Sequence, residues 1–150
     1  MKKIIITDNV DKKAVDVLVN AGFDVNYSPG MKPADIYKVI GEYHGMIVRS
    51  DTKVNAEMIS HMNAMEVIGR AGTGVDNIDS AAATRKGIIV MNTPGGNTIS
   101  TAEHTFSMMM SMCRNIAQAD ASVKAGKWDR KSYKGTEVFL SLIHISEPTR

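Results

Sequence analysis

The sequence predicts an α/β protein with a flavodoxin-like, doubly wound parallel sheet. Five short apolar runs alternate with helical patterns along the first 97 residues, and glycine or proline marks most of the junctions between them. Alternation of this kind is typical of parallel strands joined by helical crossovers. The chain has 150 residues, 43% of them hydrophobic, and this is enough to bury the core of one domain.

The predicted strands are short and rich in β-branched residues. Lys3–Thr7 reads KIIIT, a run typical of a strand that is buried on both faces. Phe23–Tyr27 alternates in polarity and ends at a Ser-Pro-Gly turn. The other three expected strands are Gly45–Val48, Glu66–Gly69 and Ile88–Met91.

Helical patterns fill the intervals between these strands. Asp11–Ala21 carries an apolar stripe at three- and four-residue spacing, and Gly22 is suited to close it. Pro33 is suited to the first turn of the next helix. Two more helices are expected over Asn55–Met62 and Asp79–Lys86. Helical crossovers of this kind join parallel strands, so all five strands are expected to be parallel. We expect them in the flavodoxin-like order 2-1-3-4-5.

A longer helix is expected after the fifth strand. Ser100–Glu103 matches a capping box, which predicts the start of this helix, and its apolar stripe continues to a stop at Gly126. A chain that leaves a finished sheet through a long helix is expected to enter a second body. We therefore predict one domain over residues 1–97, and over 98–138 an interdomain helix with the start of a second domain.

Composition excludes several classes of function. A net charge of +2 without a basic block argues against nucleic-acid binding, and no apolar run approaches the roughly 18 residues of a membrane span. Cys113 is the single cysteine, so no internal disulfide can form. The spacing of Asp76 and Asp79 is too common to indicate a metal, and Asp79 is placed to cap a helix. A cytoplasmic protein without metal or membrane partners is expected.

Polar residues directly follow three neighbouring strands. Arg49 and Ser50 follow the third strand, Arg70–Gly74 follows the fourth, and Asn92–Asn97 follows the fifth. Ligands of open parallel sheets bind beyond the carboxyl ends of the strands. The three loops are therefore expected to line one edge of the sheet, which we call the rim.

The residue types on the rim indicate an anion site. Two guanidinium groups, Arg49 and Arg70, can bind a phosphate or carboxylate as a fork. Gly72 and Gly74 allow the backbone to approach a ligand, so that consecutive N–H groups can hold an anion. The alternative is that the arginines are solvated surface charges. We interpret the pair as a site for a small dianionic metabolite.

Six motifs follow one another in a recognisable order along the chain. They are VRS at Val48–Ser50, GRAGTGVDNID at Gly69–Asp79, ATRKGI at Ala83–Ile88, VMNTPGGN at Val90–Asn97, STAEH at Ser100–His104 and AGKWDRKSYKGTE at Ala125–Glu137. Together they resemble the D-isomer-specific 2-hydroxyacid dehydrogenases, from about Ile4 to Val138. The resemblance implies NAD-dependent oxidation of the 2-hydroxyl of 3-phospho-D-glycerate to 3-phosphohydroxypyruvate, at the entry to serine synthesis.

The resemblance implies roles on the substrate side for five residues. Arg49 and Arg70 would bind the phosphate, with Ser50 beside them. The backbone amides of Gly74 and Val75 would hold the carboxylate.

The resemblance also implies contacts with the cofactor and a partner. Thr73 would touch NAD, and Asn97 would lie beside both substrate and nicotinamide. Lys127–Lys131 resembles a segment that reaches the partner subunit, so the full-length protein is expected to be a homodimer or a higher homo-oligomer.

After Val138 the chain departs from the family. A strand and a G-x-G-x-x-G turn would follow there, but residues 139–150 read FLSLIHISEPTR. The family's catalytic arginine, glutamate and histidine lie further downstream, so this chain is expected to contain no catalytic residue and to show no turnover alone. Ser141–Arg150 resembles a translated sequencing adapter, and we expect residues 139–150 not to be native.

Other functions fit parts of the sequence. A relative acting on glyoxylate, hydroxypyruvate or another 2-keto acid would share the fold, although two arginines favour a phosphorylated substrate. A receiver-type signalling domain would need an aspartate and a lysine where the chain has Arg49 and Asn92. A third alternative is an inactive module that only binds anions.

Overall fold

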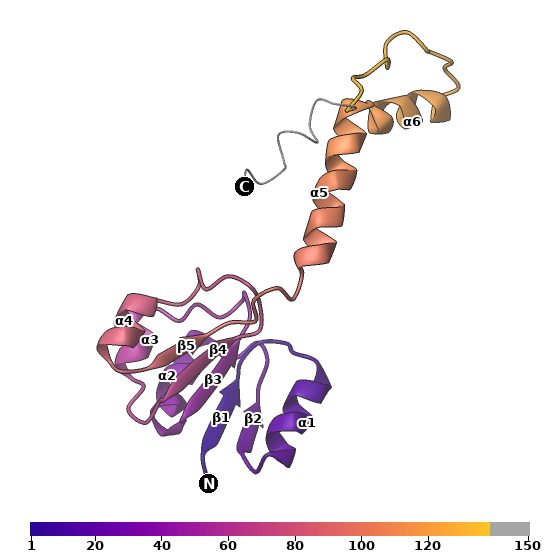
Figure 1. Cartoon of the computed structure of the whole chain (residues 1–150). Coiled ribbons are helices and arrows are strands. Elements are labelled where there is room, and N and C mark those ends of the chain that lie inside the picture. The colour runs from indigo at the N-terminus through magenta and orange to yellow at the C-terminus, as the bar shows by residue number, and fades with distance from the viewer. Residues whose placement is uncertain (139–150) are drawn as a thin grey trace, which may run out of the picture. The chain divides into compact units, whose positions relative to one another are not determined.

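The computed structural model describes residues 1–138 and divides the chain into two compact units, Met1–Gly96 and Asn97–Arg150 (Figure 1). Each unit is described by itself. The expectation that residues 139–150 are not native falls outside the described residues. No helix in the described part is long and apolar enough to cross a membrane.

The first unit is built on one parallel sheet of five strands in the order β2-β1-β3-β4-β5, which confirms the predicted fold and strand order (Figure 1). The fourth strand ends one residue later than predicted, so Arg70 is its last residue. The strands are β1 Lys3–Ile6, β2 Asp24–Tyr27, β3 Gly45–Val48, β4 Val67–Arg70 and β5 Ile89–Met91.

Four helices connect the strands, as predicted. Three begin at a side chain that accepts a hydrogen bond from the first turn: Asp11 from the Lys13 amide, Asn55 from Met58 and Asp79 from Ala82. These acceptors satisfy N–H groups that have no partner inside a helix. The helices are α1 Lys12–Asn20, α2 Pro33–Val39, α3 Ala56–Ser60 and α4 Ser80–Arg85, and a 3-10 turn η1, Ile40–Glu42, follows α2.

One face of the sheet is closed by α2, α3 and α4. Ile5, Met46 and Ile68 lie at paired positions of β1, β3 and β4 and are at most 1% exposed. Their partners from the helices include Ile36, Met58, Ile59 and Ala83. This cluster is the hydrophobic core of the first unit.

Within the first unit, α1 is the one helix on the other face, beside β1 and β2 (Figure 1). Because side chains alternate between faces along a strand, Ile4 and Ile47 point to this side. Exposure increases toward β5, where Ile89 is 63% and Met91 57% exposed. Parallel sheets normally bury both faces, and this open side forms the groove described below.

Lys86 connects α4 to the end of α3. Its ammonium group donates to the carbonyls of Ile59, at 2.8 Å, and Ser60, at 2.7 Å. These are carbonyls of the last turn of α3, so a cation there also meets the negative end of the helix dipole.

We expect Lys86→Met, which keeps the apolar stem, to lower the free energy of unfolding by about 1–2 kcal/mol because two carbonyls lose their charged donor. Urea denaturation followed by circular dichroism measures this. Lys53→Met is the matched control, since Lys53 is exposed and makes no hydrogen bond or ion pair with other described residues. Equal stability of the two variants would contradict the capping role.

The second unit contains α5, Thr98–Cys113, and α6, Ile116–Lys124. The predicted capping box at Ser100–Glu103 is wrong, because α5 begins two residues earlier. The Thr101 amide donates to the Asn97 carbonyl at 2.8 Å, and no side chain caps this end. Ser100 therefore lies inside the first turn and cannot act as the cap.

The prediction of one continuous helix as far as Gly126 is also wrong, because the structure has two helices in this segment. Asn115 has a φ of 52°, in the left-handed region, and separates α5 from α6. Asparagine tolerates this conformation better than most residues with a side chain. Apolar periodicity continues across the break, which is why the pattern alone did not reveal it. The stop at Gly126 is confirmed, since Gly126 follows α6 with a φ of 74°.

Candidate functional site

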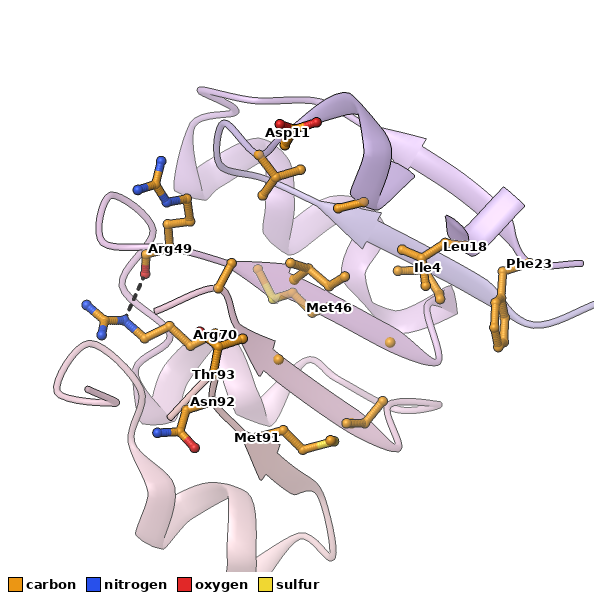
Figure 2. Close-up of a pocket in the computed structure, with 17 residues that line it drawn as sticks. Ile4, Asp11, Leu18, Phe23, Met46, Arg49, Arg70, Met91, Asn92 and Thr93 are labelled. Carbon is orange, nitrogen blue, oxygen red and sulfur yellow. Dashed lines mark hydrogen bonds between the residues drawn. The ribbon is translucent and has the colours of Figure 1, made fainter. Parts of the chain in front are cut away.

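The first unit brings the three polar loops to one edge of the sheet. Arg70 is paired in register with Val48 on the adjacent strand, so Arg49 lies one residue beyond that pair. Asn92 and Thr93 directly follow β5, which pairs with β4. Figure 2 shows these four side chains at the carboxyl ends of the strands.

A groove of about 790 Å³ runs along the open face of the sheet and ends at this rim (Figure 2). Its floor and one wall are apolar, and its polar end carries Arg49, Arg70, Asn92 and Thr93. The apolar lining includes Ile4, Ala14, Leu18, Phe23, Ile47, Val67 and Met91. A ligand at this end would meet guanidinium and amide groups on one side and hydrocarbon on the other.

The Arg70 guanidinium is held by the protein itself. One terminal nitrogen, Nη1, donates to the Gly74 carbonyl at 2.5 Å, and Nε donates to the Arg49 carbonyl at 3.3 Å, the dashed line in Figure 2. The other terminal nitrogen lies 3.6 Å from the Asp76 carboxylate. Only 14% of this side chain is exposed, so Arg70 presents a fixed positive charge from beneath the loop.

The two glycines after β4 make room for this arginine. A Cβ atom on Gly72 would lie 3.3 Å from Arg70 Nη1, and one on Gly74 would lie 3.2 Å from it. The Cβ on Gly74 would also lie 2.9 Å from the Asp76 carboxylate, closer than real Cβ contacts. The sequence suggested that these glycines let a ligand approach. The structure adds that they let the guanidinium approach.

The carbonyls of three successive residues in this loop are turned toward the protein. Gly72 accepts from the Thr93 amide at 3.0 Å, Thr73 accepts from the Asn92 side chain at 2.6 Å, and Gly74 accepts from Arg70. The C=O and N–H of a trans peptide point in opposite directions. The N–H groups of Gly74 and Val75 therefore point away from these donors, and consecutive backbone N–H groups that are not turned inward can bind an anion.

The Arg49 side chain is exposed and less constrained than that of Arg70. Within the described residues its guanidinium makes one hydrogen bond, from Nη1 to the Asn9 carbonyl at 3.3 Å. Ser50 is also exposed, and its hydroxyl donates to the Asp51 carboxylate at 3.2 Å. Arg49 thus keeps most of its donors for a ligand.

Asp8 is a residue of the site that the sequence analysis missed. It is 2% exposed and lies just after β1, where it accepts from the amides of Arg49 at 2.6 Å, Asp51 at 3.2 Å and Thr52 at 3.2 Å. The Thr52 hydroxyl also donates to it, and Thr7 lies 2.9 Å from that hydroxyl. The sequence pattern that could have identified Asp8 is a charged residue directly after a predicted strand, the same pattern that identified Arg49.

The hydrogen bonds decide the ionisation of Asp8. Burial is the largest single influence and by itself raises the pKa of this carboxyl. The Thr52 hydroxyl and the amides of Arg49, Thr52 and Asp51 together outweigh burial, so the pKa lies below its ordinary value of 3.8. Asp8 is therefore a carboxylate at neutral pH, and it holds the loop that follows β3.

A second hollow of about 540 Å³ lies beside the ends of β1 and β3. Its lining carries both signs of charge, with Lys32 and Lys53 against Asp8 and Asp51. A dianion would meet a balanced lining there and a cationic one at the rim. The rim is the better match for the predicted ligand.

The structure gives the position of two further predicted site residues, Thr73 and Asn97, but does not test their predicted contacts. Thr73 lies in the loop after β4 and is exposed. Asn97 begins the second unit and precedes α5, with its carbonyl bonded to the Thr101 amide. Their roles toward cofactor and substrate stay predictions.

The first unit is thus a flavodoxin-like α/β domain with two arginines and a glycine-containing loop at the carboxyl ends of its strands. The catalytic-domain model of the D-isomer specific 2-hydroxyacid dehydrogenases matches residues 4–132. The chain belongs to this family, which confirms the resemblance seen in the sequence.

Similar proteins within the family include phosphoglycerate enzymes. The chain is 46% identical over 136 residues to the D-3-phosphoglycerate dehydrogenase of Archaeoglobus fulgidus and 46% identical over 138 residues to that of Homo sapiens. These alignments cover 91% and 92% of the chain but 26% of each relative, so the chain spans about a quarter of their length.

A solved structure extends the comparison. The NAD+-bound 3-phosphoglycerate dehydrogenase of Entamoeba histolytica is 35% identical, with a TM-score of 0.65 over 75% of this chain and 39% of that one. The match supports the same α/β fold for the part of the chain that it covers.

Proposed function

We propose that this chain supplies the substrate-binding side of an NAD-dependent dehydrogenase that oxidises the 2-hydroxyl of 3-phospho-D-glycerate in serine synthesis. The observation that carries the proposal is the pairing of two different anion sites on one rim. Arg49 and Arg70 are suited to a phosphate, and the N–H groups of Gly74 and Val75 are suited to a carboxylate. A substrate with both groups would be held at its two ends.

The contacts of the two arginines suit them to different roles in binding a phosphate. Arg70 is fixed by Gly74 and Asp76 and contributes a charge that needs no ordering when ligand binds. Arg49 keeps donors that can close on the phosphate. Ser50 extends the same loop and can donate its hydroxyl once it leaves Asp51.

NAD would supply the hydride acceptor, and its proposed contact with this chain is Thr73. The glycines after β4, Gly72 and Gly74, lie against the Arg70 guanidinium, and Asn77 stands where a G-x-G-x-x-G turn would have its third glycine. We therefore assign to the described residues the binding and orientation of the substrate, and we do not assign hydride transfer to them. The homo-oligomer expected for the full-length protein stays a prediction.

Ligand titration of the 15N-labelled chain tests the proposal. We expect 3-phospho-D-glycerate to bind at least about tenfold more tightly than D-glycerate, because the phosphate adds a charged interaction worth about 1.5–3 kcal/mol. The amide signals of Arg49, Gly74 and Val75 should shift most. Equal affinities would reject a phosphorylated substrate and favour the glyoxylate and hydroxypyruvate type. Inorganic phosphate binding as tightly as 3-phospho-D-glycerate would favour an anion-binding module.

A further inference from the structure

The main chain of Arg49 is held from both sides. Its N–H donates to the Asp8 carboxylate at 2.6 Å, and its carbonyl accepts from the Asn77 side-chain amide at 2.7 Å and from Arg70 Nε at 3.3 Å. The peptide groups of this residue are therefore fixed, although its guanidinium is exposed. The direction in which the side chain leaves the sheet depends on these contacts.

Asn77 does more than bond to Arg49. The same nitrogen donates to the Thr52 carbonyl at 2.7 Å, so one side-chain amide spans the loop from Arg49 to Thr52. The backbone of Asn77 is fixed in turn, because its carbonyl accepts from the Val54 amide at 2.8 Å and the adjacent Ile78 forms a parallel bridge with Val54.

The chemistry of this position admits few substitutes. Both acceptors are carbonyl oxygens, so the side chain must present an NH2 group to them. The side-chain oxygen of Asn77 is buried and accepts no hydrogen bond from the described residues. An unpaired buried acceptor destabilises the folded state, and the two hydrogen bonds from the nitrogen to carbonyls of the loop compensate for it.

We propose that Asn77, together with Asp8, is a positioning residue for Arg49, and that it sets substrate affinity by directing this guanidinium onto the rim. This inference rests on the proposed function, since it assigns Arg49 to the phosphate. Asn77 itself does not touch the ligand. Its effect on binding should therefore disappear when Arg49 has no guanidinium.

A double-mutant cycle tests this dependence. We expect Asn77→Asp to weaken binding of 3-phospho-D-glycerate by about tenfold, and by less than about twofold when Arg49→Ala is already present. A residue that only stabilised the fold would weaken binding equally in both backgrounds, and this result would overturn the proposal. Asn63→Asp, at an exposed position in the loop after α3, is the matched control and should leave affinity unchanged.

A measurement without ligand separates this proposal from the proposed function. We expect the Arg49 backbone amide to have a 15N order parameter near about 0.85 in the original chain and below about 0.6 in Asn77→Asp. An unchanged order parameter would contradict the positioning role.

If the original chain binds no 3-phospho-D-glycerate, the proposed function fails while the order parameter still tests Asn77. If Asn77→Asp does not fold, Asn77→Ser removes the bridging amide without adding charge, and the same cycle applies.

Discussion

Arg70→Ala is expected to weaken the binding of 3-phospho-D-glycerate by about 100-fold, the largest effect on affinity that we predict for a single residue. The change removes the fixed positive charge of the rim. It also releases the carbonyls of Gly74 and Arg49, so the loop after β4 and the main chain of Arg49 lose this support together. Titration followed by NMR or calorimetry measures the loss.

Two further variants make this result specific. Arg70→Lys keeps the charge but cannot reach Gly74, Arg49 and Asp76 with one fork, so we expect intermediate affinity. Arg85→Ala, at the exposed end of α4, is the matched control and should bind like the original chain. An Arg70→Ala chain that stays folded and binds within about threefold of the original would reject the assignment of Arg70.

Asp8→Asn is expected to have the largest effect on stability, lowering the free energy of unfolding by about 3 kcal/mol. The asparagine has nearly the same shape, but one of its two polar atoms is a donor. It would face the Thr52 hydroxyl or the amides of Arg49, Asp51 and Thr52, all of which donate to Asp8. Asp16→Asn, on the exposed side of α1, is the matched control.

The stabilisation by Asp8 should depend on pH in a defined direction. Its folded pKa lies below the ordinary value of 3.8, so the folded state binds a proton less readily than the unfolded chain. The contribution is therefore fully present above the unfolded pKa and is lost as the pH falls through the folded pKa.

Urea denaturation at several pH values measures this dependence. We expect the difference in unfolding free energy between the original chain and Asp8→Asn to be constant at pH values well above 3.8, the ordinary pKa of an aspartate. The difference should decrease as the pH approaches 3.8 and should continue to decrease below it. A difference that did not change down to pH 2 would show that Asp8 is not held as a carboxylate.

Much of the site could be predicted because it follows from local pattern and sheet geometry. Arg49 and Arg70 directly follow or end apolar runs, and parallel strands bring their carboxyl ends to one edge. Asp8 follows β1 in the same way and could have been found by the same rule. The hydrogen-bond partners of Asp8 could not have been predicted in this way, because the Arg49 amide is 41 residues away from it in the chain.

The sequence by itself determined the order of the strands, the rim and the family, because periodicity, handedness and ordered motifs are local or topological properties. Only the tertiary structure decided how the polar groups are paired. It turned three loop carbonyls inward, placed Arg70 beneath Gly72 and Gly74, and set Asp8 and Asn77 on opposite sides of Arg49. It also interrupted the long helix at Asn115. Hydrogen bonds depend on distance and direction between segments far apart in the chain, and no spacing along the sequence contains that information.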